Sequence, residues 1–203
     1  MNSDWLNWAQ RIQALAQAGI TFTKDKYDME RYDELLAISA EMMACAKNLD
    51  AASVKETFVQ QNGYQTPKID VRGVVIKDNH ILLVQEETDG TWALPGGYCE
   101  VGLSPAENIV KEIKEESGYD SKYERVLALF DTKKHRHPPH MFHFYKLVLH
   151  CTITGGTATT GVETSNVGFF SFDDLPPLSV NRNTLEQFSI IRNQLNERQP
   201  YMD

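Results

Sequence analysis

The sequence predicts an α+β protein in which a small all-helical N-terminal domain precedes an α/β/α sandwich built around a mixed sheet. Up to about residue 60, apolar residues recur at the helical steps of three and four. From residue 70 onward, short apolar runs bounded by turn residues take their place, as expected for strands. One helix interrupts these strands and another follows them, which is typical of a sheet covered by helices on both faces.

The N-terminal segment is predicted to form three helices. Apolar residues from Trp5 to Leu15 share one face of the first helix, and Gly19 is expected to end it. A second helix is expected to start near Lys26. The third is expected to begin after Asp50, whose carboxylate suits an N-cap, and to end at Asn62-Gly63.

This pattern divides the chain into two domains. The predicted organisation is a helical domain over residues 1–62, a linker over 63–69 and a sheet domain over 70–203. Three short helices bury little surface on their own. We therefore expect them to pack on the rest of the chain or on a second subunit, and a homodimer is the expected assembly.

The sheet domain begins with a hairpin, because Lys77-Asp78-Asn79 is a polar turn between two apolar runs. A helix is expected between Pro105 and Ser117, and a last helix from about Thr184 to Leu195. The predicted strands are 71–76, 80–85, 123–130, 141–154 and 167–172.

Composition excludes several classes of protein. Hydrophobic residues make up 41% and charged residues 24% of the 203, which is ordinary for a globular chain and argues against disordered, collagen-like or coiled-coil proteins. The net charge of −8 argues against a protein that binds nucleic-acid backbones through clustered basic residues, but not against a small phosphorylated ligand held through metal ions. The three cysteines are scattered, and no signal peptide or membrane span is recognisable, so we expect a cytoplasmic protein without a membrane partner.

The helix between Pro105 and Ser117 has clear end signals. Ser104 and Glu107 form a capping box, and Pro105 suits the first helical position. Gly118 is well placed to end the helix in the left-handed conformation. With both ends fixed, the directions of the side chains between them follow from the helical period.

Three glutamates converge on this helix. Glu112, Glu115 and Glu116 are spaced i, i+3 and i+4, so they lie along one edge of the apolar stripe. Their repulsion would be relieved by a hard divalent cation such as Mg²⁺, which prefers oxygen ligands. The alternative is a solvated charged face, in which Glu107 pairs with Lys111.

The residues before the helix favour the metal-binding interpretation. Gly96-Gly97 places bare backbone just upstream, where carbonyl oxygens can approach a metal or a phosphate. The run from Gly97 to Tyr119 resembles the Nudix box, Gly-x5-Glu-x7-Arg-Glu-U-x-Glu-Glu-x-Gly-U, in which U is bulky and apolar. The spacing is intact, but Leu103 replaces the first Glu of the box and Lys111 replaces its Arg. The matching positions are Gly97, Glu112, Ile113, Glu115, Glu116, Gly118 and Tyr119.

This resemblance implies a Nudix-like sandwich fold and a Nudix pyrophosphohydrolase, which splits a nucleoside diphosphate linked to a group X into a nucleotide and phosphorylated X. Mg²⁺, with Mn²⁺ as a substitute, would be the cofactor. By position, Glu112, Glu115 and Glu116 become catalytic metal ligands, together with the carbonyl of Gly96. Glu163 is the candidate general base.

Two alternatives to these roles stay open. Glu163 could be an exposed loop residue, and Glu100 is a second candidate for the base. The replacement of Leu103 and Lys111 together avoids stranding one buried charge. We infer from this that the link between loop and helix has been rebuilt while the metal ligands were kept.

Four further residues are candidates for substrate binding. Lys133 and His135 belong to the basic cluster Lys133–His137 of this acidic chain, which could instead be an exposed polar loop. Arg72 lies on the first strand, where an arginine is more often paired or exposed. Tyr98, beside the glycines, is the candidate for stacking on a base.

The resemblance extends to a bacterial subgroup with an added helical domain, whose members are described as ADP-ribose or CDP-choline pyrophosphatases. We expect one of these two compounds as the small-molecule nucleotide substrate, with a slight preference for CDP-choline. The helical domain would then serve dimerisation or substrate selection. The alternatives are a nucleotide-binding regulatory module without turnover, or a hydrolase that processes RNA ends, which the acidic charge disfavours.

Overall fold

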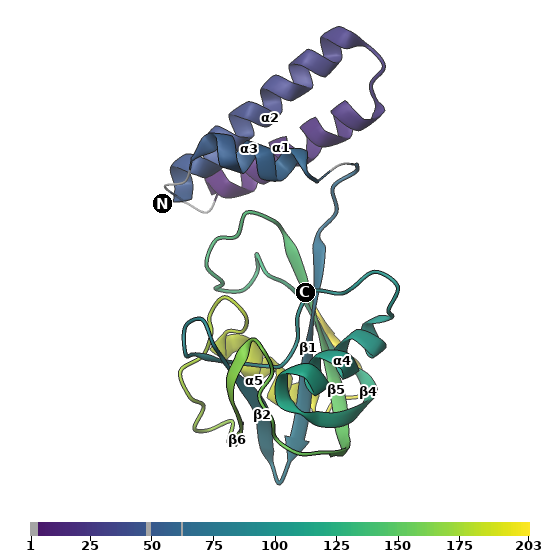
Figure 1. Cartoon of the computed structure of the whole chain (residues 1–203), viewed down its shortest axis with the longest axis vertical. Coiled ribbons are helices and arrows are strands. Elements are labelled where there is room, and N and C mark those ends of the chain that lie inside the picture. Colours follow the sequence, from purple (N-terminus) through teal and green to yellow (C-terminus); the bar gives the residue numbers. More distant parts are fainter. Residues whose placement is uncertain (1–3, 48–49, 62) are drawn as a thin grey trace. The chain divides into compact units, whose positions relative to one another are not determined.

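The computed structural model describes residues 4–47, 50–61 and 63–203 (Figure 1). The chain forms two compact units. Unit 1 consists of residues 1–67 together with 139–143, and unit 2 of residues 68–138 and 144–203. None of the helices in the described residues is both long and apolar enough to cross a membrane.

Unit 1 is a bundle of three helices, α1 (Asp4–Phe22), α2 (Lys26–Lys47) and α3 (Ala51–Val59). Its core contains Phe58 and Leu36, which are almost fully buried. Asp50 caps α3 as predicted, since its side chain accepts a hydrogen bond from the amide of Ser53.

The predicted end of α1 at Gly19 is wrong, because the helix continues to Phe22. Gly19 is instead a point of close approach to α2. A Cβ atom there would lie 2.5 Å from the ring of Tyr32. The sequence predicted that α3 ends at Asn62-Gly63. The helix ends at Val59, and Asn62 lies outside the described residues.

A short segment from the middle of the chain belongs to unit 1. Met141 and Phe142 pack against its core, and the ring of Phe142 lies 6.2 Å from that of Phe58 in an edge-on arrangement. The side chain of Gln10 donates to the backbone carbonyl oxygens of His140 and Met141. The prediction that a strand starts at Met141 is therefore wrong, because these apolar side chains are buried among helices rather than in the sheet.

Unit 2 is built on a mixed sheet with the strand order β3-β2-β1-β5-β4-β7, in which β6 also pairs with β2. The turn between β1 and β2 has positive φ at Asp78 and Asn79, which gives the two-residue hairpin that suits strand twist. Strands β1 and β5 run parallel at the centre, with Asp70 opposite Lys146. The strands are β1 (Lys68–Lys77), β2 (His80–Glu86), β3 (Trp92–Ala93), β4 (Tyr119–Asp131), β5 (Phe144–Gly156), β6 (Thr164–Phe170) and β7 (Tyr201–Met202).

Two helices cover opposite faces of this sheet, as the sequence predicts. Helix α4 (Pro105–Ser117) packs on a core that contains Val71 and Val75 of β1. Helix α5 (Leu185–Gln194) packs on a core that contains Val74. Figure 1 shows α4 in front of the strands and α5 behind them. Because strand side chains alternate, residues 71, 73 and 75 face α4, whereas residues 70, 72 and 74 face the other way.

Candidate active site

Helix α4 has the ends that the sequence predicts. Ser104 and Glu107 form a complete capping box, and Pro105 occupies the first turn. Gly118 ends the helix in the left-handed conformation, with φ of 76°. Ile109 and Ile113 are fully buried against the sheet, which fixes the rotation of the helix and hence the direction of its glutamates.

The glycine pair lies against both α4 and β1. The amide of Gly96 donates to Oε2 of Glu116 over 2.8 Å. A Cβ atom on Gly96 would lie 2.0 Å from the carbonyl oxygen of Val71, and one on Gly97 would lie 3.0 Å from Oε1 of Glu112. At Gly96 only a residue without a side chain fits, because the added atom would meet backbone, whereas at Gly97 it would meet the flexible end of Glu112.

Burial perturbs two of the three predicted ligands. It raises the pKa of Glu116 from 4.5 to about 7, against the opposing effects of Arg72 and of the Gly96 amide. Burial also raises the pKa of Glu112, whose charge in turn contributes to the raised pKa of Glu116. Glu115 is more exposed, and its Oε2 lies 3.0 Å from Nζ of Lys111.

The donor set fits a hard divalent cation in its chemistry. Glu112 and Glu116 supply carboxylate oxygens that are partly desolvated and mutually repulsive, and a cation would neutralise both. Glu115 would have to leave Lys111 to join them. Consistent with this, the described residues contain no ready-made group of three His, Cys, Asp or Glu side chains that could hold a metal.

The two departures from the box are compensated locally. Nζ of Lys111 lies 2.8 Å from Oε1 of Glu100, so the loop before α4 is joined to the helix through Glu100 rather than through position 103. Asn108, which is buried, adds a second connection, because its Oδ1 accepts from the amide of Glu100. Leu103 is moderately exposed. Asn108 escaped the sequence analysis, although a polar residue beside the apolar stripe of a helix is a usable signal.

Glu163 is exposed, in the loop that precedes β6, but the backbone around it is docked on the end of α4. The hydroxyl group of Thr164 donates to the carbonyl oxygen of Glu116 over 2.9 Å. A Cβ atom on Gly161 would lie 2.2 Å from the carbonyl oxygen of Glu115. The structure therefore brings the loop of Glu163 next to the helical turn that carries the predicted ligands.

Arg72 belongs to a buried ionic group. Its guanidinium donates to both carboxylate oxygens of Asp70 and to the carbonyl oxygen of Leu94, and Nζ of Lys146 lies 2.8 Å from Asp70. Burial alone would raise the pKa of Asp70, but the two cations outweigh it and lower this pKa. Burial lowers the pKa of Lys146 to about 8.

Sequence reasoning missed Asp70 and Lys146. The Asp-x-Arg spacing of Asp70 and Arg72 puts both side chains on one face of a strand, which was the available signal. The position of Lys146 in an apolar strand was a second signal.

Tyr98 is 64% exposed and has one ring face covered. Its ring stacks on that of Phe144, with a centroid distance of 5.5 Å and an interplanar angle of 15°. Tyr98 directly follows the glycine pair and bridges to Asp70 of β1. An aromatic ring held flat in this way is a suitable surface for a planar ligand.

His135 lies on the α5 side of the sheet, away from α4. It is buried, its ring packs edge-on against Phe130, and its Nε2 lies 3.0 Å from Oδ2 of Asp203. Lys133 is exposed in the same loop. The structure thus does not bring His135 together with the glutamates of α4.

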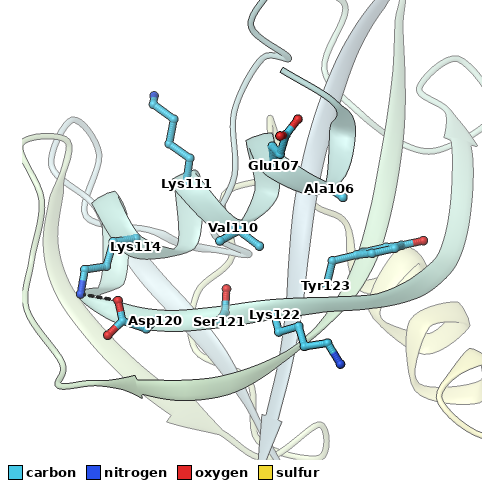
Figure 2. A pocket seen from close by; sticks show the side chains of 9 residues that line it. All are labelled: Ala106, Glu107, Val110, Lys111, Lys114, Asp120, Ser121, Lys122 and Tyr123. Carbon is cyan, nitrogen blue, oxygen red and sulfur yellow. Dashed lines mark ion pairs between the residues drawn. The ribbon is translucent and has the colours of Figure 1, made fainter. Parts of the chain in front are cut away.

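A separate groove of about 610 Å³ lies between α4 and β4 (Figure 2). Its lysines include Lys114, which pairs with Asp120 across the groove, and Lys111, which is engaged by Glu100 and Glu115. None of the predicted metal ligands is among its lining residues. These are Ala106, Glu107, Val110, Lys111, Lys114, Asp120, Ser121, Lys122 and Tyr123.

Two known families match the chain, the first over the helical segment and the second over the segment that forms the sheet. Residues 3–58 match the family described as "UDP-X-like, N-terminal oligomerisation domain", and residues 67–192 match the NUDIX domain.

Individual proteins resemble nearly the whole chain. A Bacillus subtilis protein named "Putative ADP-ribose pyrophosphatase" is 53% identical over 191 residues, which cover 94% of this chain and 92% of that protein. A crystal structure of a UDP-X diphosphatase is 39% identical with a TM-score of 0.66, and the match covers 99% of this chain and 98% of that one. A crystal structure of an ADP-ribose pyrophosphatase from Streptococcus suis is 41% identical with a TM-score of 0.62, over 68% of this chain and 100% of that one.

Replacing Gly96 tests the packing between strand and helix. Gly96→Ala should lower the midpoint of denaturant unfolding more than Gly102→Ala does. Both positions have positive φ and share a strain of about 1–3 kcal/mol, but only at Gly96 does the added Cβ meet backbone, since nothing lies within 4 Å at Gly102. Equal losses in the two variants would show that the contact with Val71 is unimportant.

The raised pKa of Glu116 has a consequence for stability. The folded protein binds this proton more tightly than the unfolded chain, so the free energy of unfolding should fall as pH rises from about 4.5 to about 7 in the absence of metal. Glu116→Gln should remove this loss and stabilise the metal-free protein at pH 8 by up to about 3 kcal/mol.

Urea denaturation in the presence of a chelator measures this difference. Glu115→Gln, which removes an exposed charge from the same helix, is the matched control and should change stability little. A Glu116→Gln variant that is less stable than the parent at pH 8 would contradict the conclusion that the charge of Glu116 destabilises the metal-free protein.

Proposed function

The chain belongs to the Nudix family, and we propose that it hydrolyses the diphosphate bridge of a nucleoside diphosphate linked to a second group, with Mg²⁺ as cofactor and ADP-ribose as the leading substrate. The observation that carries this proposal is the pair of partly buried carboxylates of Glu112 and Glu116, whose pKa values burial raises, beside the bare backbone of Gly96. ADP-ribose takes precedence over CDP-choline because a relative that covers nearly the whole chain and a solved structure that covers two thirds of it are both named for ADP-ribose.

Each residue has a role in this scheme. Glu112, Glu116 and, after release from Lys111, Glu115 would hold the cation, together with the carbonyl group of Gly96. When bound, a divalent ion supplies charge neutralisation for the diphosphate and lowers the pKa of a coordinated water. Glu163 would accept the proton of the attacking water, and this role is supported by the docking of its loop on the last turn of α4 through Thr164.

The remaining predicted residues divide by position. Tyr98 would stack on the base of the substrate, since it presents an exposed ring already held by Phe144. Arg72 would act by fixing the strand and the Leu94 carbonyl beside the glycines, because each of its three nitrogens donates to Asp70 or Leu94. Lys133 lies in an exposed loop and would contact the substrate from there. His135 would support that loop through Asp203.

Substitution of Glu116 tests the catalytic proposal. Glu116→Gln should lower kcat by orders of magnitude while the circular dichroism spectrum stays native, because a neutral amide is a poor ligand for Mg²⁺. The substrates are ADP-ribose, CDP-choline, a UDP-sugar and a nucleoside triphosphate, each with Mg²⁺ and with Mn²⁺. Near-native turnover in this variant would refute the ligand assignment, and binding of substrates by the parent without turnover would favour a regulatory module.

We also propose that the protein forms a homodimer through unit 1, which contains the predicted helical domain of residues 1–62. Helix α1 exposes an apolar row at heptad spacing, formed by Trp8, Leu15 and Phe22. These three side chains are not part of the core of unit 1. The residues of α1 that are buried in that core are Ala9 and Ala16. A match to a domain described as an oligomerisation domain supports the same assignment.

A leucine in this row offers a matched test. Leu15 and Leu185 have nearly equal exposure, 68% and 69%. Leu15→Glu should shift the mass measured by sedimentation velocity from dimer to monomer, because a charge cannot be buried unpaired in an apolar interface. Leu185→Glu should leave the dimer intact. A dimer that survives Leu15→Glu at low micromolar concentration would argue for a different interface.

A further inference from the structure

Arg182 forms an ion pair next to the candidate site that the sequence analysis did not anticipate. Its Nε lies 2.5 Å from Oε1 of Glu86. Glu86 is the last residue of β2, and its side chain is only 6% exposed. A carboxylate at such a depth needs a partner, and Arg182 supplies it.

The surroundings of Glu86 connect this pair to the carboxylates of α4. Glu86 pairs with Thr164 at the start of β6, and Thr164 in turn donates to the carbonyl oxygen of Glu116. Burial raises the pKa of Glu86, Arg182 and Arg72 oppose this, and Glu163 is near enough to add to it. The charge of Glu86 also contributes to the raised pKa of Glu116, so Arg182 is paired with a carboxylate that lies near a proposed metal ligand.

The loop that carries Arg182 is rigidly attached to the strand that leads into the glycine pair. The amide of Ser179 donates to the carbonyl oxygen of Trp92, and the amide of Leu94 donates to Oδ1 of Asn183. Within the loop, the amide of Arg182 donates to the carbonyl oxygen of Ser179. The loop of Arg182 is thus fixed against Trp92 and Leu94, the latter two residues before Gly96.

Three cations lie close together here, and they differ in accessibility. The side chains of Arg72 and Lys146 are 6% and 4% exposed, and both are committed to Asp70. Arg182 is 31% exposed. Its ion pair engages Nε, and the part of the chain that the structure describes shows no hydrogen bond from its terminal amino groups, which leaves these donors available to an anion.

We propose that Arg182 binds a phosphate oxygen of the diphosphate substrate, with Glu86 holding the guanidinium in position beforehand. This rests on the proposed function for the nature of the substrate. A guanidinium fork matches a phosphate geometrically, and the carboxylates around it, which include Asp89 as well as Glu86, would otherwise repel an anion. The pairing with Glu86 spares the side chain the loss of conformational freedom on binding.

The test separates this role from neutralisation of Glu86 alone. The variants are Arg182→Gln, Arg182→Lys and the double variant Glu86→Gln with Arg182→Gln. Arg192→Gln is the matched control, because Arg192 also forms an ion pair, with Asp173, but on the exposed side of α5. Binding of inorganic pyrophosphate in the presence of Mg²⁺ is measured by calorimetry, and KM and kcat are measured with the best substrate of the parent protein.

We expect Arg182→Gln to weaken pyrophosphate binding by about tenfold or more, as for a lost charge-assisted hydrogen bond, and to raise KM similarly. Arg182→Lys should recover part of the loss, and Arg192→Gln should match the parent. The double variant should regain thermal stability but remain weak in binding. If the double variant instead restores native binding, or if Arg182→Gln binds pyrophosphate within twofold of the parent, the proposal is overturned.

The binding arm also keeps this proposal distinct from the proposed function. A parent protein that binds pyrophosphate through Arg182 but hydrolyses none of the substrates would sustain the anion site and reject the hydrolase assignment. If the parent hydrolyses ADP-ribose and Arg182→Gln has the same KM as the parent, the hydrolase assignment stands and the anion site is rejected. A parent protein that does not bind pyrophosphate at all would overturn the anion site.

Discussion

The geometry of unit 2 depends on one close contact, in which the backbone of Gly96 is pressed between β1 and the carboxylate of Glu116. The amide hydrogen bond across this contact ties the loop, the strand and the helix to a single arrangement. It also forces Glu116 into a partly dry environment where its charge is unfavourable, as the raised pKa shows. The same packing that stabilises the fold therefore creates a carboxylate that gains from a cation, so that stability without metal and affinity for metal are set by one feature and oppose each other.

Charge is arranged around this contact in pairs of unequal burial. Asp70 forms ion pairs with Arg72 and Lys146 deep in the unit. Glu86 pairs with Arg182, and Glu100 with Lys111, both of which are nearer to solvent. The deep cations Arg72 and Lys146 are almost inaccessible to solvent, and Arg72 also holds the backbone carbonyl of Leu94. Arg182 and Lys111, with 31% and 37% of their side chains exposed, are open to solvent on one side. Cations that could meet a ligand are therefore the less buried ones.

The sequence predicted those parts of the fold that local rules determine. The capping box at Ser104 and Glu107 and the left-handed Gly118 are properties of one helix, and both were predicted correctly. The convergence of the three glutamates on a cation stays a prediction. Gly19 failed as a helix end because contact with Tyr32, distant in sequence, decides its role. The strand expected at Met141 failed for the same reason, since an apolar run is compatible with either core. Asp70, Lys146, Glu86 and Arg182 form pairs across many residues, and no local pattern specifies such partners. His135 illustrates the limit for the site, because a histidine in a basic loop gives no sign that Asp203 at the end of the chain will engage it.

The five residues 139–143 have a consequence for any shortened form of the chain. They leave the sheet unit between β4 and β5, contribute Met141 and Phe142 to the helical core, and return. The polypeptide consequently passes between the units three times rather than once. A fragment that begins at residue 68 would therefore retain two large hydrophobic side chains without the core that buries them, so the β4–β5 connection would have to be altered as well.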